Sequence, residues 1–280
     1  MLKMIILNFV KFIPWNFRIL IKDIPIISQI QRLIFKVLLS NTSFEFYIND
    51  GPFKGLKYWI ELPQDKGLWV GNYEIEVLNA IISSISKNSI CFDVGSYRGY
   101  IAGAMAVNGA EVVFAFDPLP TNIDQIQKMI TLNPHLKIQA CPIALGDQDG
   151  LVTFKVMPQP SMGKLESSPF QKLADAEETL EIQMKKIDTL VFTEKLPAPT
   201  LIKIDVEGAE FKVLQGCENV LRCYHPNLII ECHSKLLALQ CYEYLSIFSY
   251  KSIVLETQHS PADNLNLEIC HLVCKYFGKA

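Results

Sequence analysis

Two acidic residues that end apolar runs are the first candidates for binding chemistry. Asp93 is followed by Gly95 and Gly99 in the pattern D-x-G-x-x-x-G, and Asp117 ends the next apolar run 24 residues later. Glycines let the backbone pass close to a ligand and open helix amides toward it. A carboxylate at the first position suits a cationic amino group, and the two oxygens of Asp117 can accept both hydroxyls of a ribose. The spacing differs from the dinucleotide fingerprint G-x-G-x-x-G. Either acid alone can be a helix cap, but together they indicate a ligand with a ribose and a cationic group.

A second set of polar residues follows two later apolar runs. Asp205 ends one run and Glu207 lies in the turn beyond it, while Glu231 and His233 close the next run. His233 is a candidate base because imidazole titrates near neutrality, and Asp205 could orient it or a substrate. Glu207 could instead stabilise the following helix through its dipole, and His233 could be a cap or a surface residue. In a further variant Asp205 and Glu231 hold a divalent cation, but nothing enforces that ligand set, so no metal is predicted.

The eight cysteines include no C-x-x-C pair, and several lie inside apolar runs, where a reduced cysteine behaves as a small hydrophobe. A metal site from Cys232-His233, Cys270-His271 and Cys274 is disfavoured, because neighbouring residues on a strand point to opposite faces. This cysteine usage favours a reducing, cytoplasmic location.

The elements that must position these residues alternate along the chain. Short apolar runs typical of buried strands cover Ser89–Val94, Glu111–Phe116, Lys137–Ala144, Leu201–Val206 and Leu228–Cys232. Helical patterns cover Glu74–Ile85, Tyr100–Asn108, Pro120–Leu132, Ala209–Cys223 and Lys235–Phe248. Further β-like stretches cover Phe53–Leu62, the hairpin arm Gly150–Val156 and the closing antiparallel pair Ser252–Glu256 with Glu268–Tyr276. This alternation predicts an α/β fold with a doubly wound, mostly parallel, seven-stranded Rossmann-like sheet. Residues 157–180 are expected to form a loop and a short helix, either covering a substrate or simply connecting two elements.

The chain has 280 residues, half of them hydrophobic, with a formal net charge of -3. That charge argues against a nucleic-acid partner bound through its phosphates. We expect two parts, a helical, basic and apolar extension at residues 1–50 and a catalytic domain at residues 51–280.

Residues 1–40 carry six basic residues and one acidic residue, a surplus of five positive charges. The apolar stretch at the start is interrupted by lysines and ends at Pro14, so it is too short to span a membrane, and no signal-peptide cleavage site follows it. Two interpretations remain open. The segment packs on the catalytic domain, or it lies on anionic lipid at the inner face of the membrane.

With these features in place, the sequence resembles the FkbM family of methyltransferases, a branch of the Rossmann-like enzymes that use S-adenosylmethionine (SAM). The resemblance covers roughly residues 67–233. It rests on Gly71-Asn72-Tyr73-Glu74, Phe92-Asp93-Val94-Gly95 through Gly99-Tyr100, Ala115-Phe116-Asp117-Pro118, Ala144-Leu145-Gly146-Asp147, the block from Ile202 to Glu210, and Leu228-Ile229-Ile230-Glu231. The block I-K-I-D-V-E-G-A-E is the most specific of these.

The resemblance implies that SAM is the cofactor, with Asp93, Gly95 and Gly99 beside its methionine part. It also implies that Asp117 binds the ribose and that Ala144 lies near the adenine. This chain has Ser96 and Tyr97 where the family commonly has alanine and asparagine, and Asp117 where it commonly has glutamate. Ser96 and Tyr97 remain compatible with a cofactor-binding turn. Asp117 is one methylene shorter, which could loosen ribose binding.

The expected activity is SAM-dependent methyl transfer to a hydroxyl of a sugar or secondary metabolite, with Asp205, Glu207 and His233 as catalytic candidates. The expected partner is therefore a small-molecule or glycan acceptor, and the acceptor itself and the oligomeric state are not encoded in a readable form. A nucleotide-dependent oxidoreductase or sugar-modifying enzyme on the same fold is the competing hypothesis. A third hypothesis is a non-catalytic membrane-associated module. It is disfavoured because the candidate cofactor residues are intact, namely Asp93, Gly95, Gly99 and Asp117.

Overall fold

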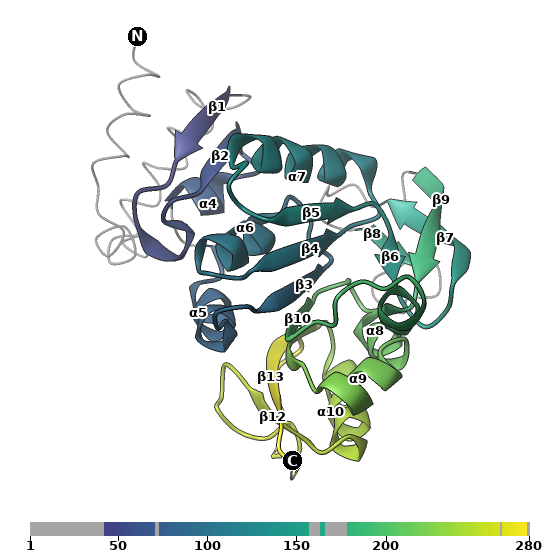
Figure 1. The fold of residues 1–280 in the computed structure, drawn as a ribbon. Coiled ribbons are helices and arrows are strands. Elements are labelled where there is room, and N and C mark those ends of the chain that lie inside the picture. The colour runs from purple at the N-terminus through teal and green to yellow at the C-terminus, as the bar shows by residue number, and fades with distance from the viewer. Residues whose placement is uncertain (1–41, 71–72, 157–162, 166–177, 264, 279–280) are drawn as a thin grey trace.

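A seven-stranded sheet forms the centre of the computed structural model, which describes residues 42–70, 73–156, 163–165, 178–263 and 265–278 (Figure 1). The strand order is β12-β13-β11-β10-β3-β4-β5. The strands are β3 (Ile90–Val94), β4 (Val112–Phe116), β5 (Ile138–Cys141), β10 (Leu201–Ile204), β11 (Asn227–Cys232), β12 (Tyr250–Val254) and β13 (Cys270–Tyr276). Strands β5, β4, β3, β10 and β11 pair in parallel, and β13 runs antiparallel to both β11 and β12. The predicted mostly parallel, doubly wound α/β fold is confirmed, including the closing antiparallel pair.

Helices cover both faces of this sheet because its strands are apolar on both sides. Cys91 packs in one core cluster, and its neighbour Phe92 packs in the other. The first cluster lies under α5 (Ile75–Ser84), α6 (Tyr100–Val107) and α7 (Pro120–Leu132), and the second under α8 (Glu210–Gln215), α9 (Glu218–Tyr224) and α10 (Lys235–Ile247). Continuous apolar strands with alternating side chains are what two covered faces require.

An antiparallel hairpin packs beside α7 and α6 (Figure 1). It consists of β1 (Thr42–Tyr47) and β2 (Lys57–Leu62), with the short helix η2 (Gly51–Phe53) between them and α4 (Lys66–Val70) after them. The prediction of a helical segment as far as residue 50 was therefore wrong for residues 42–47, since these residues pair with β2 and bury Phe46. Residues 1–41 lie outside the described part, so the rest of the extension and the boundary at residue 50 stay predictions.

A small second sheet lies beyond the carboxyl ends of the central strands (Figure 1). Its strands are β6 (Ala144–Leu145), β7 (Gly150–Val156), β8 (Gly163–Leu165) and β9 (Glu178–Lys185), in the order β6-β9-β7-β8. The predicted single strand over residues 137–144 was wrong, because the chain leaves β5 after Cys141 and enters this second sheet at Ala144. Within the predicted loop at 157–180, residues 163–165 and 178–180 are strand, and the remainder lies outside the described residues.

The predicted single helix over residues 209–223 is two helices. Asp188, just before the π-helical turn η4 (Thr189–Thr193), accepts hydrogen bonds from the backbone amides of Asn219 and Val220 at 2.9 Å each and so caps α9 separately. A Cβ on Gly216 would lie 1.9 Å from the carbonyl oxygen of Gly146, so the break occurs where two backbones meet. In the described part of the chain, no helix combines the length and apolar character that crossing a bilayer requires.

Candidate functional site

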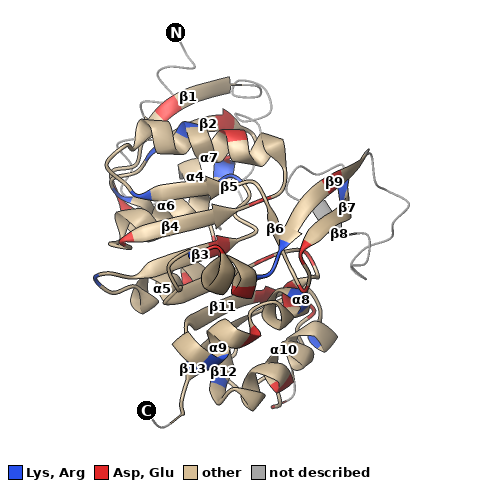
Figure 2. Ribbon diagram, turned by 45° about the vertical axis from the view of Figure 1, so that its right-hand side comes forward, with Lys and Arg blue, Asp and Glu red and all other residues tan. Residues whose placement is uncertain are grey.

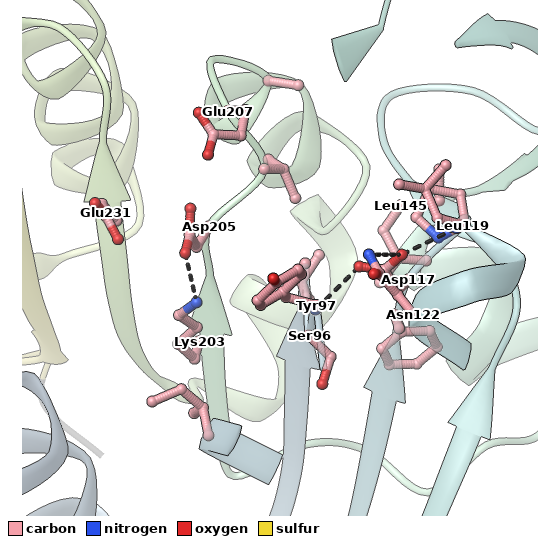
Figure 3. A pocket seen from close by; sticks show the side chains of 18 of the residues that line it. Ser96, Tyr97, Asp117, Leu119, Asn122, Leu145, Lys203, Asp205, Glu207 and Glu231 are labelled. Atoms are coloured by element: carbon pink, nitrogen blue, oxygen red, sulfur yellow. Dashed lines mark hydrogen bonds and ion pairs between the residues drawn. The ribbon is translucent and has the colours of Figure 1, made fainter. Parts of the chain in front are cut away.

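One cavity of about 390 Å³ opens at the carboxyl ends of β3, β4, β10 and β11. At one end it is lined by Asp117, Leu119, Asn122, Leu145 and neighbouring residues, which we call the Asp117 end. At the other it is lined by Glu74, Lys203, Asp205, Glu207 and Glu231, which we call the carboxylate end. Ser96 and Tyr97 lie between the two ends (Figure 3). Parallel α/β sheets bind ligands at this edge, where the strand order reverses.

The glycine turn after β3 is shaped first by the protein's own backbone. The amides of Gly95 and Ser96 donate to the carbonyl of Phe116 at 3.0 and 2.9 Å. Gly95 has a φ of +76°, and a Cβ there would lie 1.7 Å from the carbonyl oxygen of Asp205. Glycine is therefore required at position 95 by the close approach of β3 and β10, independently of any ligand.

The predicted cofactor residues divide into those that line the cavity and those that support it. Gly95, Ser96, Tyr97, Asp117 and Ala144 line it, whereas Asp93 and Gly99 do not. The carboxyl of Asp93 is completely buried and accepts a hydrogen bond of 2.7 Å from the hydroxyl of Ser96. Burial is the main cause that raises the pKa of Asp93. Asp93 therefore stabilises the glycine turn through its hydrogen bond to Ser96 and does not itself line the cavity.

Asp117 is buried and accepts three hydrogen bonds from its own surroundings (Figure 3). The backbone amides of Tyr97 and Leu119 donate at 3.0 and 2.9 Å, and the side-chain amide of Asn122 donates at 3.0 Å. Burial raises the pKa of Asp117 to about 6, against the effect of these donors. The shorter acid is thus tied to the glycine turn, and these three bonds leave its carboxylate about one further acceptor site.

A buried ion pair anchors the same turn to the β1–β2 hairpin. The guanidinium of Arg98 lies 2.7 Å from Asp65 and 3.0 Å from Glu61, and its backbone carbonyl accepts a hydrogen bond of 2.7 Å from the hydroxyl of Tyr58. The hydroxyl of Tyr100 also bonds to Asp65. The sequence does not predict these contacts, since the partners of Arg98 and Tyr100 lie more than 30 positions away along the chain.

The carboxylate end is organised around a buried lysine. The Lys203 ammonium lies 2.9 Å from the Asp205 carboxylate, and the side chain of Lys203 is only 4% exposed (Figure 3). Burial opposes its charge, but Asp205, Asp93 and Glu74 together raise the pKa of Lys203. Burial also raises the pKa of Asp205, with Lys203 opposing that effect.

His233 lies behind this end and does not line the cavity. Its Nδ1 is 2.8 Å from the buried Glu210, and its Nε2 is 3.4, 3.7 and 3.9 Å from Glu207, Asp205 and Glu231. Burial disfavours the imidazolium, but the hydrogen bond and charge of Glu210, followed by Asp205 and Glu207, raise the pKa of His233 to about 9. The ring is therefore protonated at neutral pH, which does not fit the predicted role of a free base in contact with the acceptor.

Glu207 does line the cavity, and its backbone has a φ of +52°, which is uncommon for a residue with a side chain. Burial raises the pKa of Glu207 to about 7, although the nearby His233 opposes this. A carboxyl that titrates near neutrality is suited to proton transfer.

Glu231 is held by a second histidine that we had considered only as a metal ligand. His271 pairs with Glu231 across β11 and β13, and its Nε2 and Nδ1 lie 3.3 Å from Glu231 and 2.6 Å from Glu256. Burial opposes ionisation of Glu231, but the hydrogen bond to His271 and the charge of Lys203 lower its pKa to about 2. Acidic residues gather near α8 and β11 in Figure 2.

Asp205, Glu231 and His233 bring their possible ligand atoms within 4.8 Å of one another, a spacing that a metal could use. The ammonium of Lys203 already supplies a cation to Asp205, so we assign no metal to this group. The cysteine–histidine site set aside above has no counterpart among the described clusters, since Cys232, Cys270 and Cys274 are buried in the core.

The sheet order and the cavity at its switch point define a Rossmann-like protein of the methyltransferase type. The FkbM methyltransferase domain matches residues 93–260, which is more than half of the chain. The chain therefore belongs to the FkbM methyltransferase family, and the predicted resemblance is confirmed.

Similar proteins cover the chain in part. The hexuronic acid methyltransferase AglP of Haloferax volcanii is 27% identical over 161 residues, 58% of this chain and 63% of that protein. Methyltransferase 1 of Beauveria bassiana is 27% identical over 139 residues, 44% of this chain and 56% of that protein. This chain thus spans less than two thirds of either relative. The crystal structure of an FkbM methyltransferase from Methylobacillus flagellatus is 20% identical with a TM-score of 0.48, covering 68% of this chain and 44% of that one.

Proposed function

We propose that the protein transfers the methyl group of SAM to a hydroxyl of a small-molecule or glycan acceptor. The observation that carries this proposal is a single cavity that joins a ribose-type acceptor, Asp117, to an end rich in carboxylates, Glu74, Asp205, Glu207 and Glu231. A nucleoside with a cationic substituent matches both ends.

The residues present fit SAM by the chemistry of the cavity wall. The remaining acceptor site of Asp117 is available to a ribose hydroxyl, and Leu119, Leu145 and Phe154 offer an apolar surface for the adenine. The carboxylate end provides negative charge for the ammonium and sulfonium. When bound, SAM supplies an electrophilic methyl group.

The protein's own part in the reaction is to orient the acceptor and remove its proton. We assign removal of the acceptor's hydroxyl proton to Glu207, which lines the cavity and whose pKa of about 7 suits that step. Asp205, fixed by Lys203 at 2.9 Å, orients the acceptor hydroxyl. His233 becomes a positioning residue, since it lies behind Asp205 and Glu207 and bonds to Glu210.

For the acceptor we propose a hydroxyl on a sugar or related metabolite. Carboxylates that face a cavity are good acceptors for the hydroxyl hydrogens of a polyol. The relative from Haloferax volcanii is named for a sugar-derived substrate, which supports the same class. The loop at 157–180, which we predicted could cover the acceptor, lies largely outside the described residues.

The test is incubation of the protein with methyl-labelled SAM and a fractionated extract of its host, followed by identification of the labelled product. We expect label on a hydroxyl-derived methyl ether, and we expect Glu207→Gln to abolish most of it while Glu218→Gln, an exposed acid on α9, does not. Label on nitrogen or carbon would contradict the assignment.

We also propose that residues 1–40 lie on anionic lipid at the inner face of a membrane, on the strength of their charge surplus alone. Co-sedimentation with anionic vesicles should recover the full chain but not a chain that starts at residue 41. If both remain in the supernatant, this proposal fails.

A further inference from the structure

The cavity wall is strongly unbalanced in charge. Five of the described lining residues are acids, namely Glu74, Asp117, Asp205, Glu207 and Glu231, and Lys203 is the one described lysine or arginine among the lining residues. The ammonium of Lys203 forms an ion pair with Asp205 at 2.9 Å. Four of the five acids lie at the carboxylate end, where they outnumber Lys203 and the protonated His233 behind them.

Among these acids, Glu231 lies between two histidines. One carboxylate oxygen lies 3.3 Å from His271, which Glu256 holds in turn from 2.6 Å, and the other lies 3.9 Å from His233. The backbone of His271 also donates to Glu256, at 3.1 Å, so imidazole and main chain are clamped together. A carboxylate held in this way keeps its charge when a ligand arrives, whereas a looser acid could simply take up a proton.

We propose that Glu231 is a specificity-determining residue that makes the cavity bind the cationic donor, SAM, more tightly than its neutral product, S-adenosylhomocysteine (SAH). The two molecules differ at the sulfur, which is a sulfonium in the donor and a thioether in the product. A partly buried negative charge attracts the sulfonium and not the thioether. Contacts to adenine and ribose do not distinguish the two molecules, because both molecules carry these groups.

This inference rests on the proposed function, and it has a consequence for turnover. Loss of the methyl group removes the sulfonium charge and leaves the ammonium, so the carboxylate end holds the product more weakly than the next donor molecule. Of the three residues Glu231, Glu256 and His271, the two acids lie inside the matched family domain at residues 93–260, and His271 lies outside it.

Isothermal titration calorimetry with SAM, SAH and sinefungin tests the proposal on the full chain. Sinefungin carries an amine that is protonated at neutral pH in place of the methylsulfonium, so it should bind like SAM. We expect the native protein to bind SAM about fivefold or more tighter than SAH. Glu231→Gln should lose about tenfold in affinity for SAM and sinefungin and less than about twofold for SAH.

Two further variants separate charge from structure. Glu231→Asp keeps the charge and should retain most of the preference for SAM. Glu218→Gln, which removes an exposed acid paired with Arg222 on α9, should leave all three affinities unchanged. Thermal melting of each variant checks that it is folded.

Each contrary result is informative. If the native protein binds SAH as tightly as SAM, or if Glu231→Gln weakens both ligands equally, the inference is wrong while the proposed function stands. If neither SAM nor SAH binds, the proposed function itself fails.

Discussion

The two ends of the cavity use carboxyl groups in different ways. At the Asp117 end one carboxyl accepts three hydrogen bonds from nearby donors, two of them backbone amides. At the carboxylate end Asp205, Glu207 and Glu231 surround His233, while Lys203 pairs with Asp205 and His271 pairs with Glu231. The pKa of Glu207 is raised to about 7 and that of Glu231 is lowered to about 2. The first end is organised by backbone geometry, and the second is organised by competition among charges. We therefore expect changes at the first end to depend little on pH above pH 7, since the pKa of Asp117 is about 6, and changes at the second end to depend strongly on pH.

The largest expected effect on stability comes from Gly95, where the backbones that follow β3 and β10 approach each other between the two ends of the cavity. Gly95→Ala places a Cβ 1.7 Å from the carbonyl oxygen of Asp205 in a left-handed backbone, so we expect a loss of about 4 kcal/mol in the free energy of unfolding. Gly109→Ala is the matched control, because Gly109 has a φ of +100° but no atom within 4 Å of a Cβ. Its loss should be about 1 kcal/mol in urea denaturation. Equal losses would show that the close approach of β3 and β10 is unimportant.

Next in size is removal of the cation at the carboxylate end. Lys203→Met leaves Asp205 without its partner in a buried site, and we expect a loss of about 3 kcal/mol at pH 8. The loss should shrink as the pH falls, because burial raises the pKa values of Asp205 and Glu74 and protonation removes the charge that Lys203 would otherwise balance. Lys185→Met, which breaks a partly exposed pair with Glu194, should cost less than about 1 kcal/mol. A loss for Lys203→Met that is independent of pH would contradict the account.

A third prediction concerns the two clamping histidines. The pKa values of His233 and His271 are raised from 6.5 to about 9, so each stabilises the folded protein fully below pH 6.5 and loses that contribution as the pH rises through 9. We expect the native protein to lose stability across this window, by about 2 kcal/mol per histidine. His271→Gln should flatten the decline by about half, whereas His259→Gln, on an exposed loop, should not alter it. If the decline of stability with pH is unchanged in His271→Gln, the interaction between His271 and Glu231 is not ionic.

The smallest change is expected at the Asp117 end. Asp117→Asn turns an amide toward donors that need an acceptor, and we expect about 1 to 2 kcal/mol of lost stability with little pH dependence above pH 7. Binding of SAM should weaken about tenfold. Asp149→Asn alters a similar acceptor outside the cavity, which bonds the amide of Lys186 and the hydroxyl of Thr189, and should leave SAM affinity unchanged. Equal SAM affinity in Asp117→Asn would remove the ribose assignment.

The same contrast explains how much could be predicted from the sequence. The central strands, the helices around them and the positions of Asp93, Asp117 and Asp205 at strand ends follow from local apolar patterns and glycine spacing. The β1–β2 hairpin, strand β9 and the anchor of Arg98 on Asp65 could not be predicted, because their partners are distant in the sequence. The roles of the acids could not be predicted either. Only the burial of His233 and the pairing of Glu231 with His271 across two strands show that one histidine supports the site from behind and the other fixes a carboxylate.

The central claim is that both ends of the cavity together bind SAM. Calorimetric titration of the full chain with SAM, with SAH and with NAD tests it most directly. We predict saturable binding of one SAM per chain, displaced by SAH, with no response to NAD. Binding of NAD with no response to SAM or SAH would contradict the account and favour an oxidoreductase.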